Sequence, residues 1–436
     1  MKDVTLFSAE DAAKYESLGC WERLSLGEHL DCLAQAHPDR HALIFGSDRF
    51  TYEDLKLEAD RLAGALLQKG IQPGDFIAVQ LPNSSLFVIL SFALFKIGAI
   101  PIYIMPAHRE IELSGIFQKA KPKAYVVCKR YLGFQYEEMV QRLQQNNSSI
   151  EIVLFADPDA DFYADNGLIS DAAATVAAPS SRSLALFLLS GGTTGIPKLI
   201  PRTHADYAYN AKASAERCKL DEDSVYLTVL PAGHNFPLGC PGLLGTLLKG
   251  GKVVMAATSS PDEVFPLIEQ EQVTVTALVP ALVNLWLKAL SWNESDISSL
   301  KLLQVGGSPL DRGLAERVTS ELGCTLQQVF GTAEGFESYT SLDDPQDVIW
   351  NTQGKPLSPF DDVKIVDNDG KILGPGAVGE LYIKGPYSIR GYYNEDEHNL
   401  KSFTADGYYK SGDLATFTPC GNQMCIRDRP RRWRPF

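Results

Sequence analysis

Residues 188–198 read Leu188-Leu189-Ser190-Gly191-Gly192-Thr193-Thr194-Gly195-Ile196-Pro197-Lys198. The apolar run before them, residues 184–189, predicts a buried strand. Glycines let a backbone approach a ligand closely, and the hydroxyls and the lysine supply hydrogen-bond donors and one positive charge. These groups favour a polyphosphate site over an ordinary glycine-threonine turn. The nucleotide-kinase pattern G-x-x-x-x-G-K-[ST] is excluded, because Lys198 stands three residues after Gly195.

Three further motifs occur downstream: Pro231-Ala232-Gly233-His234-Asn235-Phe236-Pro237, Gln327-Gln328-Val329-Phe330-Gly331-Thr332-Ala333-Glu334-Gly335 and Tyr409-Lys410-Ser411-Gly412-Asp413. Together with the first loop, they resemble the signatures of the adenylate-forming (AMP-binding) superfamily in order and spacing. The resemblance runs from about residue 21 to about residue 421. Finer matches at 198–204, 303–307 and 351–356 resemble the stand-alone aryl-acid adenylating branch, which activates 2,3-dihydroxybenzoate or salicylate for siderophore and non-ribosomal peptide synthesis.

Composition excludes several other classes of protein. The chain has 436 residues, enough for two or three domains, and 45% of them are hydrophobic. A net charge of −14 argues against nucleic acid and against an anionic membrane as partners. The most apolar stretch, residues 86–95, is too short to span a bilayer and predicts a buried helix. The eight cysteines have no metal spacing and no C-x-x-C pair, and no secretory signal is visible, so we expect reduced thiols in a cytoplasmic protein.

Alternating strand and helix signals predict an α/β fold with two doubly wound lobes and a small barrel-like β subdomain. We expect helices at 51–70 and 86–97, and strands at 76–81, 124–127, 152–155, 184–189, 225–230, 252–256, 273–278, 301–305, 363–366, 380–384 and 407–410. The expected units are a first lobe at 1–183, a second lobe with the phosphate loop and aryl pocket at 184–335, and the β-rich subdomain at 336–421.

The last fifteen residues, 422–436, depart from the family pattern. Five of the final ten are arginine, and the segment has neither helical nor strand periodicity. We interpret it as a disordered basic tail left by a truncation or a reading-frame scar; a nucleic-acid-binding tail is the alternative. The resemblance implies a C-terminal lid carrying a catalytic lysine. We expect this lid to be absent, so that the chain binds its substrates but turns over slowly.

The resemblance implies the chemistry of ATP activation. A carboxylate attacks the α-phosphate, pyrophosphate leaves, and the protein neutralises the charge that develops. Lys198, Thr332 and His234 are the implied catalytic residues, and Glu334 is the implied Mg²⁺ ligand, with a solvated surface charge as its alternative. The implied ATP-binding residues are Ser190, Gly191, Gly192, Thr193, Thr194, Gly195, Lys198, Gly307, Val329, Phe330, Gly331, Thr332 and Asp413. Asp413 would accept the ribose hydroxyls, and Phe330 either stacks on adenine or belongs to the core.

The resemblance also implies an aryl-acid pocket made of Asn235, Phe236, Cys240, Gly306, Ser308, Val329 and Glu337. Asn235 would bond the hydroxyl ortho to the carboxylate. Amino-acid-activating relatives have an aspartate there, which pairs with an ammonium group, so a neutral side chain indicates an acid without that amine.

Two pocket residues bear on which acid is used. Cys240 resembles the salicylate enzymes, and a thiol, being a weak donor, disfavours a buried 3-hydroxyl. Glu337 replaces an apolar residue, and an unpaired buried carboxylate is costly. We therefore expect Glu337 to turn to solvent or to meet a donor on the substrate, such as an aryl amine or a ring N–H.

Three functions remain open at this point. The first is an aryl-acid–AMP ligase that transfers its product to the phosphopantetheine thiol of an aryl carrier protein. The second is an acyl- or aryl-CoA ligase. The third is a non-catalytic module that binds ATP and an aryl acid, for which the missing lid lysine would speak. ATP–pyrophosphate exchange with a panel of acids separates them.

Overall fold

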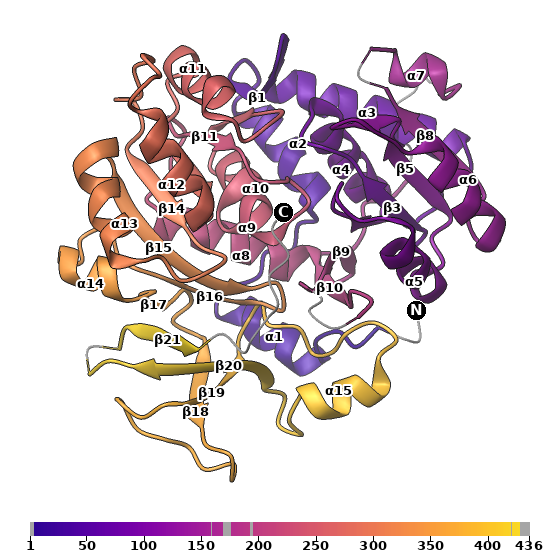
Figure 1. Ribbon diagram of the computed structural model, residues 1–436. Coiled ribbons are helices and arrows are strands. Elements are labelled where there is room, and N and C mark those ends of the chain that lie inside the picture. The colour runs from indigo at the N-terminus through magenta and orange to yellow at the C-terminus, as the bar shows by residue number, and fades with distance from the viewer. Residues whose placement is uncertain (1–3, 158, 169–175, 192–194, 420, 428–436) are drawn as a thin grey trace.

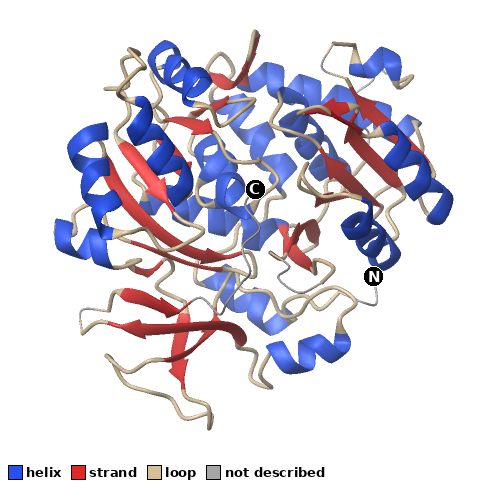
Figure 2. Cartoon of the chain, viewed as in Figure 1, coloured by secondary structure: helices blue, strands red, loops and turns tan. Residues whose placement is uncertain are grey.

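The computed structural model describes residues 4–157, 159–168, 176–191, 195–419 and 421–427. It contains two large mixed sheets and one small sheet (Figures 1 and 2). The predicted α/β class is confirmed, because parallel strands alternate with helices along most of the chain. The six-stranded sheet has the order β10 (Leu199–Thr203), β9 (Leu184–Leu189), β4 (Ile100–Tyr103), β3 (Phe76–Gln80), β5 (Ala124–Cys128), β8 (Ile152–Ala156). Its strands are parallel except β10, which runs antiparallel to β9.

The nine-stranded sheet has a parallel centre and antiparallel edges. Its order is β17 (Lys355–Pro356), β16 (Phe336–Tyr339), β15 (Thr325–Thr332), β14 (Leu302–Val305), β13 (Val275–Leu278), β11 (Val225–Thr228), β12 (Lys252–Met255), β1 (His41–Phe45), β2 (Asp48–Thr51). The parallel strands β11 to β15 end at one edge of this sheet, which is where α/β folds place their ligands.

Strand pairing crosses the chain boundary that the sequence predicts at residue 183. The hairpin β1–β2 belongs to the nine-stranded sheet, although it lies in the N-terminal part of the chain. The hairpin β9–β10 belongs to the six-stranded sheet, although it follows residue 183. Each predicted lobe therefore contributes one hairpin to the main sheet of the other lobe. The division of the chain at residue 183 stays a prediction.

The small sheet is fully antiparallel, in the order β18 (Asp362–Val366), β19 (Gly379–Lys384), β20 (Tyr409–Phe417), β21 (Gln423–Arg427). Among the described residues it is an open sheet, with β18 and β21 at its edges. The expectation that the chain from 422 onward forms no strand is wrong for 423–427, whose backbone pairs with β20. Residues 428–436 lie outside the described residues. A two-stranded hairpin, β6 (Arg130–Tyr131) and β7 (Phe134–Gln135), completes the strands.

Helices cover both faces of the large sheets. Several of them pack on one another between the two sheets (Figure 1): α2 (Leu26–Ala36), α3 (Tyr52–Gln68), α4 (Ser85–Ile97), α8 (His204–Arg217), α9 (Asn235–Gly239) and α10 (Gly242–Leu248). The remaining helices are α1 (Ala9–Ser17), α5 (Glu110–Ala120), α6 (Glu137–Asn146), α7 (Phe162–Asp165), α11 (Pro261–Glu271), α12 (Pro280–Ala289), α13 (Arg312–Arg317), the π-helix η1 (Val318–Leu322), α14 (Gln346–Asn351) and α15 (Asp396–Ser402).

Local chemistry explains the two helices that the sequence predicts. Thr51 caps α3 with a capping box, in which its hydroxyl accepts from the Asp54 backbone while the Asp54 carboxylate accepts from the Thr51 N–H. Helix α4 is apolar on nearly every side and almost completely buried. It ends at Gly98, which adopts a left-handed conformation with φ of 70°.

Candidate active site

The predicted site residues converge from all three sheets. The loops that follow β11, β14 and β15 carry most of the 234–240, 306–308 and 332–337 groups, and they leave the same edge of the nine-stranded sheet. The six-stranded sheet contributes the β9–β10 loop, and the small sheet contributes β20. Because these parts are remote in sequence, folding alone brings the predicted motifs together.

The predicted phosphate loop is the connection of the β9–β10 hairpin. Two hydrogen bonds close its base: the Ser190 N–H donates to the Lys198 carbonyl, and the Lys198 N–H donates to the Ser190 hydroxyl, both at 3.0 Å. Gly191 and Gly195 are exposed. Gly192, Thr193 and Thr194 lie outside the described residues. The hairpin thus holds the lysine at a fixed place beside an exposed, glycine-rich backbone.

Tyr392 joins the two ends of the predicted phosphate site. The Lys198 ammonium lies 5.1 Å from the centroid of its ring. The Tyr392 hydroxyl donates to Glu334 Oε1 at 2.7 Å and lies 3.1 Å from the Tyr409 hydroxyl. Burial, and then the Glu334 carboxylate, raise the pKa of Tyr392 far above its usual value, so it stays a donor. The sequence pattern missed Tyr392, because its partners Glu334 and Tyr409 lie 58 and 17 positions away along the chain.

Thr332 is the last residue of β15, and its hydroxyl lacks a hydrogen-bond partner among the described residues. The side chain is buried, and among the described residues its Oγ1 has no hydrogen-bond partner. Strand β15 extends to this residue, two positions beyond the end expected at Phe330. Phe330 is half-buried, with its ring 6.1 Å from that of Phe336, and Gly331 is exposed. A buried polar group without a partner is unusual in a folded protein and is typical of a ligand contact.

A β-bulge in β20 sets the position of Asp413. The register of β19 on β20 moves from Glu380↔Leu414 to Tyr382↔Lys410, which leaves extra residues on β20. Gly412 sits in this bulge with φ of 78°, a conformation that favours glycine. The Ser411 hydroxyl accepts from the Asp413 N–H at 3.0 Å, and the Asp413 side chain is 3% exposed. The carboxylate therefore comes from the interior of a strand, not from its end as expected.

His234 is held at the start of α9. Its Nδ1 accepts from the Phe236 N–H at 3.2 Å. Asn83, from the loop after β3, holds the backbone that precedes His234. It donates to the Thr228, Leu230 and Ala256 carbonyls and accepts from the Ala232 N–H. His234 is exposed to solvent although protein surrounds the ring, as for a side chain on the wall of a cleft. Desolvation lowers its pKa to about 4.

The predicted apolar part of the aryl pocket is assembled in space. Phe236, Cys240 and Val329 belong to one apolar cluster. A side chain at Gly306 would lie only 2.9 Å from the Val329 carbonyl and 3.1 Å from the Phe236 ring, so the absence of a Cβ there lets the three pack closely. The next residue, Gly307, is exposed with φ of 81°, and Ser308 is half-buried.

Glu337 is fully buried, so the expectation that it turns to solvent is wrong. Its carboxylate accepts four protein hydrogen bonds: from Asn210 Nδ2 at 2.8 Å and Cys240 Sγ at 2.7 Å on Oε1, and from the Ser214 hydroxyl at 2.8 Å and the Tyr339 hydroxyl at 2.6 Å on Oε2. Burial excludes the solvent-facing alternative. Four donors are the full complement of a carboxylate, so no substrate donor is needed.

Arg202 is a second buried group that sequence reasoning missed. It is 0% exposed and donates to Asp206 Oδ1 at 2.6 Å, to the Ala333 carbonyl at 3.2 Å and to Asn210 Oδ1 at 3.2 Å. The contact with Ala333 links β10 of the six-stranded sheet to the turn between Thr332 and Glu334. An arginine inside an Arg-Thr-His run gave no hint of this, because its partners lie on other elements.

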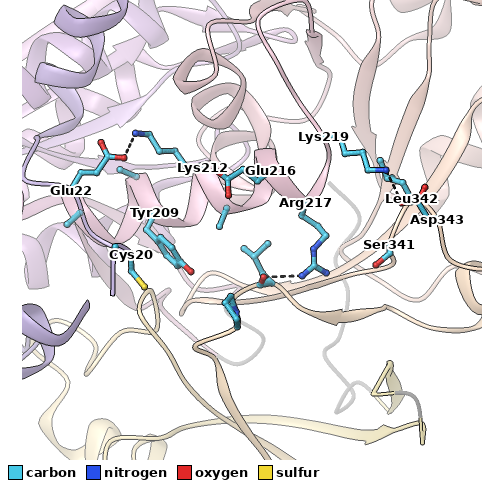
Figure 3. A pocket seen from close by; sticks show the side chains of 16 residues that line it. Cys20, Glu22, Tyr209, Lys212, Glu216, Arg217, Lys219, Ser341, Leu342 and Asp343 are labelled. Carbon is cyan, nitrogen blue, oxygen red and sulfur yellow. Dashed lines mark hydrogen bonds and ion pairs between the residues drawn. The ribbon is translucent and has the colours of Figure 1, made fainter. Parts of the chain in front are cut away.

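A separate cavity of about 550 Å³ lies on the outer side of α8 (Figure 3). Its basic side chains already have partners: Lys212 pairs with Glu22, Lys219 pairs with Asp343, and Arg217 donates to the Pro356 and Leu357 carbonyls. No predicted site residue lines it. The cavity is therefore not part of the candidate active site.

Residues 31–393 match the family model described as AMP-binding enzyme. The chain belongs to the AMP-binding enzyme family. Two curated relatives in this family are the 2,3-dihydroxybenzoate-AMP ligase of Bacillus subtilis, 44% identical over 97% of this chain and 78% of its own, and the salicyl-AMP ligase / salicyl-S-ArCP synthetase of Mycobacterium tuberculosis, 44% identical over 95% of this chain and 75% of its own.

A solved structure of another AMP-binding enzyme has the same fold. The apo structure of MbtA from Mycobacterium smegmatis superposes with a TM-score of 0.91 at 41% identity, covering 98% of this chain and 80% of that one. Within the described residues, no helix is both long enough and apolar enough to cross a membrane. In the same ranges, no cluster of three or more His, Cys, Asp or Glu side chains forms a metal cage.

Proposed function

We propose that this AMP-binding enzyme is an aryl-acid–AMP ligase, which joins an aryl carboxylic acid to ATP and releases pyrophosphate. One observation carries the proposal. Gly306 packs without a Cβ against Phe236 and Val329 of one apolar cluster, and the Thr332 hydroxyl, buried and without a partner among the described residues, follows on the strand of Val329. An apolar aryl ring suits this cluster, and a phosphate oxygen suits the hydroxyl. The names of the relatives support the same reaction.

The phosphate side of the site supplies both charge and donors. Lys198 brings a positive charge to the base of the glycine loop, and Thr332 brings a hydroxyl donor. Glu334, which accepts from the Tyr392 hydroxyl through Oε1, would hold Mg²⁺. One carboxylate is enough for a Mg²⁺ ion that also binds phosphates, and the ion would screen the negative charge of the triphosphate. Asp413 would accept the ribose hydroxyls.

His234 would act as a neutral donor. With a pKa lowered to about 4, the imidazole is uncharged near neutral pH. Its Nδ1 accepts from a backbone N–H, so the ring hydrogen is on Nε2. A neutral N–H donor can orient the acid or an α-phosphate oxygen without forming an ion pair that would weaken the attacking carboxylate.

Salicylate fits this pocket better than 2,3-dihydroxybenzoate. The Cys240 thiol has one hydrogen, and Glu337 accepts it at 2.7 Å. Nothing then remains on the sulfur to donate to a 3-hydroxyl, and a thiol is a weak acceptor. A 3-hydroxyl buried beside it would lose its hydrogen bonds to water without a good replacement.

The acceptor of the activated acid would be the phosphopantetheine thiol of an aryl carrier protein, in siderophore or non-ribosomal peptide synthesis. The printed name of the Mycobacterium tuberculosis relative, salicyl-S-ArCP synthetase, supports this choice. Coenzyme A presents the same thiol, so it is the direct alternative. A cytoplasmic location belongs to the proposal, because six cysteines are free thiols: Cys20, Cys32, Cys128, Cys218, Cys240 and Cys324.

The test is ATP–pyrophosphate exchange by the purified chain with Mg²⁺ and four acids: salicylate, 2,3-dihydroxybenzoate, benzoate and decanoate. We expect exchange with salicylate to exceed that with benzoate by about tenfold or more, the value of one buried hydrogen bond. Decanoate should give only background. Exchange that is equal for all acids, or absent with every aryl acid while ATP still binds, would contradict the proposal.

Two asparagine variants sharpen this result. Asn235→Ala should abolish the preference for salicylate over benzoate. Asn293→Ala is the matched control, because the Asn293 side chain contacts only the backbone of Pro261 and Ser295, away from the site. A preference lost in both variants would mean that the effect is not local to the pocket.

A further inference from the structure

Glu337 sits at one end of a chain of hydrogen bonds that leads to Asn235. Protein groups lie within hydrogen-bond distance of both carboxylate oxygens, two on each. The Ser214 hydroxyl has one hydrogen, for which the Asn210 carbonyl competes at 2.8 Å. Protein groups therefore satisfy Glu337 without a substrate donor. A buried charge is retained at a cost, and one well-attested use of such a group is to fix the direction of its neighbours' hydrogen bonds.

The carboxylate determines what Cys240 can do. In the contact between Cys240 Sγ and Glu337 Oε1 the thiol is the donor, so this contact uses the single hydrogen of the thiol. Burial, together with the nearby carboxylate, raises the pKa of Cys240 well above its usual value, so the thiol keeps that hydrogen. The longer contact with the Asn235 carbonyl, 3.3 Å, cannot use it at the same time. The sulfur is left with lone pairs alone.

Cys240 in turn determines the direction of the Asn235 amide. The side chain lies 3.2 Å from the sulfur, which can only accept, so the Nδ2 group must face Cys240. Oδ1 then faces the Tyr207 hydroxyl, which donates to it at 3.0 Å. Burial raises the pKa of Tyr207 strongly, so this phenol also keeps its hydrogen. The donor that Asn235 has left for a ligand is the second N–H of Nδ2.

We propose that Glu337 is a specificity-determining positioning residue, which acts through Cys240 to hold Asn235 as a donor and so selects acids with an acceptor oxygen ortho to the carboxylate. The inference rests on the proposed function. A phenolic oxygen accepts from the free N–H of Asn235. An ortho amine turns its own hydrogens toward that N–H, and its lone pair is delocalised into the ring, so two donors meet in a buried site.

The test measures binding, so that it does not depend on the rate of turnover. Two non-hydrolysable acyl-sulfamate analogues of the adenylates are compared by calorimetry, one with a 2-hydroxybenzoyl group and one with a 2-aminobenzoyl group. In the unmodified chain we expect the hydroxyl analogue to bind about tenfold or more tightly. Glu337→Gln replaces one acceptor oxygen by a donor without changing the shape, and it should reduce the preference to within about threefold.

Variants at Cys240 keep the proposal testable if Glu337→Gln fails to fold. Cys240→Ser retains both a donor for Glu337 and an acceptor for Asn235, so the preference should persist. Cys240→Ala removes both, and the preference should fall as in Glu337→Gln. Ser214→Ala is the matched control, because it removes a donor from Oε2, the carboxylate oxygen that does not face Cys240. It should lower the melting temperature and leave the preference unchanged.

An infrared measurement reports on the relay without any ligand. The S–H stretching band that disappears in Cys240→Ala should shift to higher frequency in Glu337→Gln, because a thiol that donates to a carboxylate has a weakened S–H bond. An unchanged preference in both Glu337→Gln and Cys240→Ala, or an equal loss in Ser214→Ala, would overturn the inference. Failure of the hydroxyl analogue to bind the unmodified chain would instead overturn the proposed function.

Discussion

Thr332 illustrates how a single atom can separate stability from function. Its hydroxyl is buried at the end of β15 and has no hydrogen-bond partner among the described residues. Leaving a buried hydroxyl unpaired costs about 1–3 kcal/mol. A group that lowers stability in the free protein, and that lies two residues before Glu334, is more useful to a bound phosphate than to the fold.

We predict that Thr332→Val leaves the free energy of unfolding unchanged or raises it by up to about 1 kcal/mol, because valine fills the same space without an unpaired hydroxyl. The rate of salicylate-dependent exchange should fall by about 10- to 100-fold. Urea denaturation and pyrophosphate exchange measure the two effects. Thr276→Val is the control: its hydroxyl donates to the Leu227 carbonyl at 2.8 Å, so it should lose about 1 kcal/mol of stability and keep its activity.

Glu337 shows what sequence reasoning could not reach at the residue scale. The motif placed it beside the aryl pocket, and the cost of an unpaired carboxylate was assessed correctly. The donors that answer it come from Asn210 and Ser214, on a helix more than a hundred residues earlier, and from Cys240. No spacing or composition signal links these positions. The sequence therefore showed that a buried Glu337 needs partners, and only the fold identified them.

Elements whose signals are local were predicted well. The capping residue Thr51 and the apolar run of α4 each determine a helix within one stretch of chain, and residues 184–189 form β9 with the expected bounds. The bulge in β20 and the strand β21 were missed. Both depend on pairing with a neighbouring strand, and a bulge or an edge strand leaves no periodic pattern of its own.

At the bulge of β20, we predict that Gly412→Ala destabilises the protein by about 1–2 kcal/mol, since an alanine is strained at φ of 78°. The same change should raise the KM for ATP, because it redirects Asp413. Thermal unfolding and exchange kinetics test this. Gly370→Ala is the control, at φ of 83° in an open turn remote from Asp413: a similar loss of stability with an unchanged KM is expected, and a raised KM there would contradict the argument.

The junction of α2 and α8 predicts a pH dependence. The buried His204 accepts from the Leu26 N–H at 3.2 Å through Nδ1, and burial lowers its pKa to about 3. The unfolded chain titrates near 6.5, so from pH 6.5 downward only the unfolded state gains this proton. The stabilisation is complete above pH 6.5 and is lost as the pH falls toward 3.

His204→Asn keeps an acceptor for the Leu26 N–H but does not titrate. We predict that, from pH 6.5 to pH 4.5, its free energy of unfolding falls by about 2 kcal/mol less than that of the unmodified chain. Urea denaturation at each pH gives the comparison. His29, buried nearby with a pKa lowered to about 4, is present in both proteins, and its charge also contributes to the low pKa of His204. His41→Asn, at an exposed position of β1, should leave the pH dependence as it is; parallel curves for His204→Asn and the unmodified chain would exclude this explanation.

At the scale of the whole molecule, one buried arginine, which also forms an ion pair, links the two large sheets by a hydrogen bond. Arg202 on β10 pairs with Asp206 and reaches the Ala333 carbonyl of the nine-stranded sheet. Removing one partner of a buried pair leaves an uncompensated charge. We predict that Arg202→Met lowers the free energy of unfolding by about 3–5 kcal/mol.

Chemical denaturation measures this loss, and Arg312→Met is its control. Arg312 makes an exposed pair with Glu316 at 2.8 Å, so its removal should cost less than about 1 kcal/mol. Equal losses in the two variants would mean that the link between the sheets adds nothing. A folded Arg202→Met protein should also bind ATP more weakly, because the turn at Ala333 joins Thr332 to Glu334.

The exchange of hairpins between the large sheets has a consequence for the order of events on the ribosome. All strands of the six-stranded sheet have been synthesised once residue 203 has emerged, and a nascent chain can begin to fold as it emerges. The hairpin at 41–51 emerges much earlier, but its parallel partner, at 252–255, is made only after the strands of the six-stranded sheet. During translation this early hairpin must wait with an unpaired edge, the kind of surface that chaperones protect.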